Sequence, residues 1–126
     1  MPYPPGTQNY HYEMELVIAI GAPVFKVTPE AARAAVWAYA AGLDMTRRDL
    51  QAEAKANGRP WDTAKGFEQS AVITELVRVS DTGVLHAGTI SLAVNGVQKQ
   101  RGDIADMIWS VPEIVANLSQ YYHLQP

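Results

Sequence analysis

The chain has 126 residues, of which 48% are hydrophobic, and its formal net charge is −3. This length and composition predict one domain, over residues 1–126, with a real apolar core, and they disfavour a disordered chain. The sequence contains no cysteine, which excludes disulfides, thiolate metal sites and a cysteine nucleophile.

Charge and hydropathy also limit the expected partners. Lysine and arginine are scattered among the acids, so the sequence offers no basis for nucleic-acid binding. The weakly acidic balance disfavours docking to anionic membranes, and no stretch approaches the roughly 20 apolar residues that span a bilayer. Because the start of the sequence lacks the basic and apolar regions of a signal peptide, we expect a cytoplasmic protein.

The first third of the chain predicts an arm, a strand and a helix. Residues 1–10 are rich in proline and glycine and favour an extended arm. Residues 13–20 carry β-branched side chains and predict a strand. A helix is expected over 28–37, since Thr28 suits the N-cap and Pro29 the first helical position.

The middle of the chain predicts a second strand and a second helix. We expect the strand over 39–46, ending near Asp44. Thr46 and Asp49 have the spacing of a capping box, which predicts a helix over 47–57. The stretch 60–67 is expected to be irregular.

The last part of the chain predicts mainly strands, followed by two helices. The Asn95-Gly96 pair is typical of a tight β-hairpin turn. The expected elements are strands over 71–79, 88–94 and 97–100, a short helix over 103–109, and a capped helix over 110–122. This order predicts an α+β fold, mixed, with a largely antiparallel sheet.

Two glutamates open the first strand and form the first candidate site. If Glu13 and Glu15 lie on a strand, both carboxylates point to one face, where they repel each other unless a cation neutralises them. Hard divalent cations prefer such carboxylate oxygens. The alternative is an edge strand with two solvated glutamates.

Further candidates follow the second strand. Asp44 ends an apolar run, and the alternative to a site there is a strand-end aspartate that binds local amides. Arg47 and Arg48 at a helix N-terminus oppose the helix dipole, which indicates that at least one of them binds an anion. The alternative is a solvated helix start with internal ion pairs. Lys65 lies in an apolar neighbourhood and is either an electrostatic stabiliser or a surface lysine. The three histidines show no metal-ligand spacing; they are His11, His86 and His123.

Three blocks of sequence together resemble the fumarylacetoacetate hydrolase family, and within it most closely the fumarylpyruvate hydrolases of gentisate breakdown. The blocks follow the family's order and spacing, and the similarity extends over nearly the whole chain. They are His11-Tyr12-Glu13-Met14-Glu15-Leu16, Gly42-Leu43-Asp44-Met45-Thr46-Arg47-Arg48-Asp49-Leu50-Gln51 and Gly58-Arg59-Pro60-Trp61-Asp62-Thr63-Ala64-Lys65-Gly66-Phe67.

The resemblance implies a β-roll core with short flanking helices, and a chain that lacks the family's first and last segments. One of these segments carries a His/Glu pair that activates water, and the other a Thr-Gly-Thr-Pro-type loop. The resemblance also implies a homodimer. Tyr12 departs from the family, which usually has a histidine at that position.

The resemblance further implies a site and a reaction. It places Mg²⁺ or Mn²⁺, with Ca²⁺ as a further option, on Glu13, Glu15 and Asp44. It makes Lys65 catalytic and assigns Arg48 and Gln51 to binding a small 2-oxo-acid substrate. The reaction it implies is hydrolysis of a carbon–carbon bond in an acylpyruvate, such as fumarylpyruvate to fumarate and pyruvate.

Two alternatives stay open at this point. One is a different reaction of the same family, namely oxaloacetate decarboxylation or a muconate-type isomerisation or hydration. The other is a non-catalytic fragment that binds a metal ion or an oxo acid.

Overall fold

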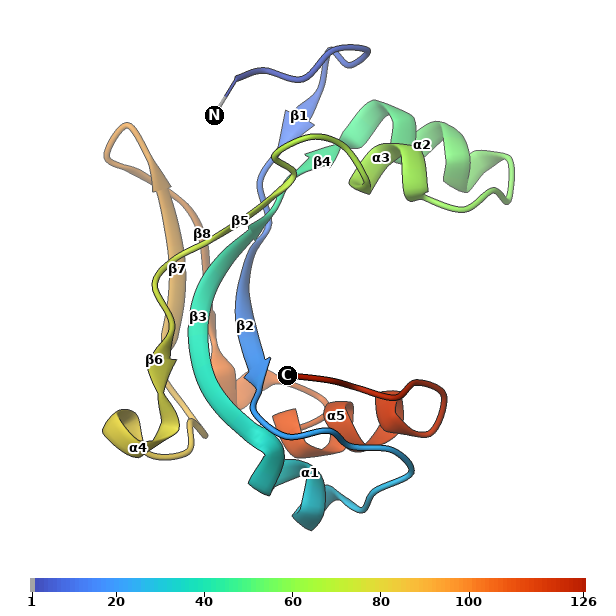
Figure 1. Ribbon diagram of the computed structural model, residues 1–126. Helices are drawn as coiled ribbons and strands as arrows, with labels where there is room; N and C mark the ends of the chain where they lie inside the picture. Colours follow the sequence, from blue (N-terminus) through green and yellow to red (C-terminus); the bar gives the residue numbers. More distant parts are fainter. Residues whose placement is uncertain (1) are drawn as a thin grey trace. The chain divides into compact units, whose positions relative to one another are not determined.

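The computed structural model describes residues 2–126, which divide into two compact units. The first unit comprises the chain up to Glu15 together with residues Ala41–Thr74, and the second comprises Leu16–Ala40 and Glu75–Pro126. Five α-helices and eight strands are present among the described residues (Figure 1), so the expected α+β class is confirmed. That residues 1–126 form a single partial domain stays a prediction.

The sheets are antiparallel wherever the pairing is defined, as the sequence predicts. Strand β2 (Met14–Ile20) pairs with β3 (Val36–Asp44), which pairs with β5 (Ala71–Ile73) and β6 (Val77–Arg78) at different points. β5 is antiparallel to β3, with Ala71 opposite Asp44. The strand expected over 71–79 is therefore two short strands, and α4 (Val79–Thr82) follows them directly.

In the first unit, a short ladder fixes the start of a helix. Strand β1 (Tyr10–His11) pairs antiparallel with β4 (Thr46–Arg47), and α2 (Arg48–Ala56) begins at the next residue. The capping box predicted at this helix is wrong. Thr46 lies in β4 and donates to the Asp44 carbonyl (3.3 Å), while Asp49 binds the N-terminal arm, 41 and 42 residues away.

A single helical turn, α3 (Asp62–Lys65), occupies the stretch expected to be irregular. It lies beside α2 (Figure 1) and buries the Ala64 methyl group completely. The prediction failed because one turn is too short to show a helical period in the sequence.

In the second unit, helices α1 (Pro29–Ala35) and α5 (Val111–Ser119) pack against each other (Figure 1). Both start as predicted, α1 with Thr28 as N-cap and α5 with a capping box between Ser110 and Glu113. Their packing closes the apolar core, whose buried members are Ala32, Val36, Tyr39, Val111, Val115 and Ala116.

The predicted hairpin is also confirmed. Strands β7 (Thr89–Val94) and β8 (Val97–Asp103) pair across Asn95 and Gly96. Both turn residues have positive φ, 51° and 78°, which a type I′ turn requires. A short 3₁₀ turn, η1 (Ile104–Asp106), replaces the longer helix expected over 103–109.

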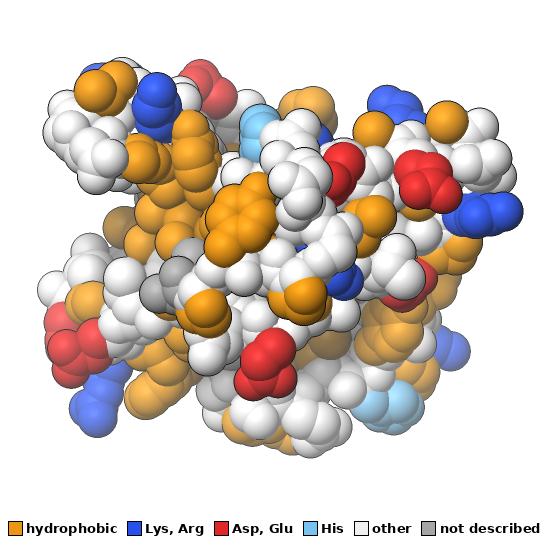
Figure 2. All heavy atoms as spheres, turned by 90° about the horizontal axis from the view of Figure 1, so that it is seen from above, with side chains coloured by type: hydrophobic (Ala, Val, Ile, Leu, Met, Phe, Trp, Pro, Cys, Tyr) orange, Lys and Arg blue, Asp and Glu red, His pale blue; other side chains and the backbone are white. Residues whose placement is uncertain are grey.

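The surface mixes charge types. On the face shown in Figure 2, acidic and basic side chains are interspersed among hydrophobic ones. Within residues 2–126, no helix has the length and apolar character needed to cross a membrane. The expected absence of nucleic-acid partners stays a prediction.

Candidate metal centre

Three carboxylates of the first unit converge at the ends of two strands. Glu13 directly precedes β2, Glu15 lies within it, and Asp44 is the last residue of β3. The Asp44 amide donates to the Glu13 carbonyl (2.9 Å), which holds the two backbones together. As a result, one oxygen from each carboxylate lies within 4.8 Å of one oxygen of each of the others.

Two cationic side chains neutralise part of this cluster. Lys65, the last residue of α3, donates its ammonium to Glu13 Oε2 (2.6 Å) and Asp44 Oδ2 (2.5 Å). Arg48, in the first turn of α2, donates from Nη2 to Glu13 Oε1 (2.7 Å) and from Nη1 to the side-chain oxygen of Gln51 (2.6 Å). The arginine at this helix start therefore forms an ion pair with Glu13, and the binding of an anionic ligand by Arg47 or Arg48 stays a prediction.

The electrostatics differ between neighbouring carboxylates. Burial alone would raise the pKa of Glu13, but hydrogen bonds from Lys65 and Arg48 hold it below its ordinary value. Desolvation, and then the like charges of Asp44 and Glu13, raise the pKa of Glu15. Desolvation would lower the pKa of Lys65, but its bonds to Asp44 and Glu13 raise it, so the ammonium is charged at neutral pH.

The donor set suits a hard divalent cation. Three carboxylates facing one lysine and one arginine leave one uncompensated negative charge. Within residues 2–126, the Glu15 carboxylate has no hydrogen bond or salt bridge of its own. Glu13, Glu15 and Asp44 offer oxygen ligands only, which is the chemistry that Mg²⁺, Mn²⁺ and Ca²⁺ prefer. The residues therefore fit such an ion.

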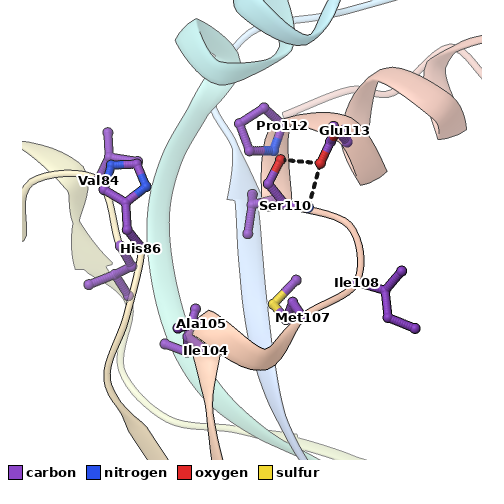
Figure 3. Close-up of a pocket in the computed structure, with 11 residues that line it drawn as sticks. Val84, His86, Ile104, Ala105, Met107, Ile108, Ser110, Pro112 and Glu113 are labelled. Atoms are coloured by element: carbon purple, nitrogen blue, oxygen red, sulfur yellow. Dashed lines mark hydrogen bonds between the residues drawn. The ribbon is translucent and has the colours of Figure 1, made fainter.

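Among the described residues, no histidine belongs to this set of ligands. His11 stacks on Tyr12, with ring centroids 6.4 Å apart, and His123 stacks on Phe25 (3.7 Å). His86 is exposed beside a hollow of about 250 Å³ in the second unit, which Figure 3 shows. The polar groups of Ser110 and Glu113 in that hollow bond to each other, with Glu113 accepting from the Ser110 amide (2.7 Å) and hydroxyl (2.6 Å).

The sequence did not reveal the residues that surround the carboxylates and their cations. The sequence pattern presents Arg47 only as one of two arginines at a helix start, whereas its guanidinium contacts the N-terminal arm, α3 and an aromatic ring. The sequence spacing predicts a helix cap at Asp49, but its carboxylate accepts from the Thr7 hydroxyl (2.5 Å) and the Gln8 amide (2.8 Å). Each of these contacts links segments far apart in the chain, which local spacing cannot show.

Comparison with known proteins gives consistent matches along the whole chain. The sequence profile described as "Fumarylacetoacetate (FAA) hydrolase C-terminal" matches residues 1–126. A fumarylpyruvate hydrolase from a Ralstonia species is 55% identical over 124 residues, which are 98% of this chain and 64% of that protein. An oxaloacetate tautomerase of Escherichia coli is 37% identical over 118 residues, or 93% of this chain and 54% of that protein.

A solved structure matches the backbone. The crystal structure of fumarylpyruvate hydrolase from Pseudomonas aeruginosa in complex with Mn²⁺ and pyruvate aligns with a TM-score of 0.95 and 49% identity. The alignment covers 98% of this chain and 53% of that one. The chain thus spans less than two thirds of the length of these relatives.

Proposed function

Since this chain belongs to the fumarylacetoacetate hydrolase family, we propose that it is the metal-binding part of an acylpyruvate hydrolase acting on fumarylpyruvate or a close analogue. The observation that carries the proposal is the convergence of Glu13, Glu15 and Asp44 within 4.8 Å. The Mn²⁺ and pyruvate in the Pseudomonas aeruginosa relative support both the ion and the 2-oxo-acid class.

In this proposal the three carboxylates hold Mg²⁺ or Mn²⁺, with Ca²⁺ as a further option. When bound, such an ion supplies Lewis acidity toward the oxygens of a 2-oxo acid. A divalent cation changes the net charge of the carboxylates and their two cations from −1 to +1. A substrate carboxylate then brings the charge to zero, so the charge balance favours an anionic substrate.

Lys65 has the position and charge of an electrostatic catalyst. Its ammonium lies between Glu13 and Asp44, at 2.6 and 2.5 Å, and its raised pKa keeps it protonated. A fixed ammonium at this point stabilises negative charge that develops on a substrate oxygen when the carbon–carbon bond breaks. We therefore assign Lys65 a catalytic role.

Arg48 and Gln51 are assigned to substrate binding. Arg48 uses one terminal nitrogen for Glu13 and the other for Gln51, so its guanidinium plane is fixed before substrate arrives. Its side chain is about one third exposed and can meet a carboxylate from solvent. The Gln51 side-chain amide lies beside it and offers N–H donors to a substrate oxygen.

The test is hydrolysis of an acylpyruvate by the purified protein. We expect release of pyruvate and the matching acid with Mn²⁺ present, and loss of about 100-fold or more in rate with Glu13→Ala. Metal-loaded protein that binds pyruvate but releases no product would contradict the hydrolase assignment.

Oxaloacetate tautomerisation is the second candidate, because relatives with that name are 37% identical to this chain. The same lysine and arginine would stabilise an enolate without cleavage of a carbon–carbon bond. Assaying oxaloacetate and an acylpyruvate side by side separates the two reactions, and the 55% identity to a fumarylpyruvate hydrolase favours cleavage.

Three expectations accompany this function as proposals: Mg²⁺ as an ion that the site binds, a cytoplasmic location and a homodimer. Light scattering of the purified chain tests the dimer, and a monomer at micromolar concentration would contradict it. Competition between Mg²⁺ and Mn²⁺ at cellular concentrations tests the ion.

A further inference from the structure

Arg47 directly precedes Arg48, and among the described residues it makes no ion pair with the three carboxylates. Its Nη1 donates to the Pro5 carbonyl of the arm (3.0 Å), and its Nη2 donates to the Thr63 carbonyl in α3. Its guanidinium carbon stands 4.7 Å from the centre of the Phe67 ring. One arginine side chain therefore contacts a residue before Lys65 in the sequence, Thr63, and a residue after it, Phe67.

Helix α3 needs support from outside because it has little of its own. It is a single turn, Asp62–Lys65, and its N-cap Trp61 makes no side-chain capping bond. Isolated turns of helix are unstable, since nucleation fixes several dihedrals for one hydrogen bond. The Thr63 carbonyl is one of the last carbonyls of the helix, and these have no hydrogen-bond donor within it. The Arg47 guanidinium supplies that donor for Thr63.

The backbone of Arg47 is itself well fixed. It belongs to β4, pairs with Tyr10 of β1, and is the residue from which α2 begins. Its buried Nε has no hydrogen-bond partner among the described residues, which carries a desolvation cost. The contacts of the two terminal nitrogens and the ring must outweigh that cost for the side chain to stay in place.

From these contacts we propose that Arg47 is a positioning residue, which holds α3 so that the Lys65 ammonium reaches Glu13 and Asp44. The inference rests on the proposed function for its catalytic meaning, but the placement of Lys65 can be tested without it. Arg47 connects α3 to the start of α2, where Arg48 binds the same Glu13. One side chain thus sets the spacing between the two cations.

The rival role for Arg47 is to anchor the arm. The arm, however, has other anchors, because Asp49 accepts from Thr7 and Gln8, and the Arg48 amide donates to the Asn9 carbonyl (2.8 Å). Asp49→Ala therefore loosens the arm while leaving the Arg47–Thr63 contact, and serves as the matched control.

The experiment is NMR on the ¹⁵N-labelled, metal-free chain, with two readouts. One is the Lys65 ammonium resonance, assigned with Lys65→Ala. The other is hydrogen exchange of the Lys65 and Gly66 amides, which close α3 onto Trp61 and Asp62, with the Asn57 amide of α2 as reference.

Arg47→Met keeps the apolar stem over Phe67 but removes both donors. We expect its Lys65 ammonium and α3 amides to exchange about tenfold faster, the ratio that loss of one charge-assisted hydrogen bond gives. Arg47→Lys keeps the charge on a single donor nitrogen, so it should fold if Arg47→Met does not, and exchange should rise about threefold. In Asp49→Ala the Lys65 signals should stay unchanged.

Wild-type exchange at Lys65 in a folded Arg47 variant would overturn the proposal, and so would equal acceleration in Asp49→Ala. A Mn²⁺ titration of the same wild-type sample separates this result from the proposed function. Absence of Mn²⁺ binding would refute the metal site, while the NMR comparison would still decide whether Arg47 positions Lys65.

Discussion

In the second unit, where α1 and α5 pack together, the core contains six buried residues that include Tyr39, and further apolar residues from β2 and the C-terminal segment pack against it. In the first unit, the buried hydrophobic residues are Met45, Ala54 and Ala64, as far as residues 2–126 are concerned. Long-range hydrogen bonds and ion pairs of charged side chains take the place of an apolar core there.

This difference between the two units explains why the candidate site is in the first unit. Apolar contacts stabilise a fold without fixing the direction of individual groups, whereas charged contacts hold atoms at defined distances and carry a desolvation cost. A site that brings three carboxylates together needs charged contacts. We therefore expect core changes in the second unit to cost the most stability, and charge changes in the first unit to have small effects of either sign.

The largest expected effect is in the apolar core. Val115 on α5 is 5% exposed, and Val115→Ala should lower the free energy of unfolding by about 2 kcal/mol, through lost burial and the cavity left behind. Denaturant unfolding of the metal-free chain measures it. Ile108, which is 97% exposed, provides the control, and Ile108→Ala should cost less than about 0.5 kcal/mol. Equal losses of unfolding free energy in Val115→Ala and Ile108→Ala would contradict the role of the apolar core in the second unit.

A smaller loss is expected when Lys65 is replaced. Lys65→Met removes the ammonium that holds Glu13 and Asp44 together, and should cost about 1 kcal/mol in the metal-free chain, because the groups are partly exposed. Lys55→Met on the exposed face of α2 should cost less than about 0.5 kcal/mol and serves as the control.

The pH dependence of that loss follows from the two pKa shifts. The lowered pKa of Glu13 gives stability that is present above its ordinary value and is lost as the pH falls through the folded-state pKa. The raised pKa of Lys65 gives stability that is present below its ordinary value and is lost as the pH rises through the folded-state pKa. The difference between wild type and Lys65→Met should therefore be full between about pH 5 and pH 10, and a constant difference down to pH 2 would contradict this.

The smallest expected effect is a gain in stability rather than a loss. Glu15 has a raised pKa, so its charged form destabilises the metal-free fold, and Glu15→Gln should stabilise it by about 0.5 kcal/mol at pH 7. The gain should vanish below about pH 4, where Glu15 is protonated in both states. Thermal unfolding in the presence of a chelator measures it, and a destabilised variant at pH 7 would show that Glu15 has a favourable partner.

Local signals in the sequence predicted most of the fold. The strand that became β2, the Thr28 cap, the Ser110–Glu113 box and the Asn95-Gly96 turn each depend on residues within a few positions of one another. The single turn α3 and the split between β5 and β6 escaped prediction, because elements of two to four residues carry no readable period.

The candidate site was predicted differently. Spacing made Glu13 and Glu15 a plausible pair, but their convergence with Asp44 and Lys65 came only from the family resemblance. Neither pattern nor resemblance indicated the role of Arg47, since its partners Pro5 and Thr63 lie 42 and 16 residues away. Contacts of this kind depend on the folded chain.

The most direct test of the account is a Mn²⁺ titration, by calorimetry or electron paramagnetic resonance, of the wild-type chain, Asp44→Asn and the exposed control Glu53→Gln. We predict one Mn²⁺ per chain for wild type and for Glu53→Gln, and an affinity for Asp44→Asn that is lower by about 100-fold, or about 2.7 kcal/mol. Equal affinity in all three, or no binding to wild type, would contradict the assignment of Glu13, Glu15 and Asp44 as a metal centre.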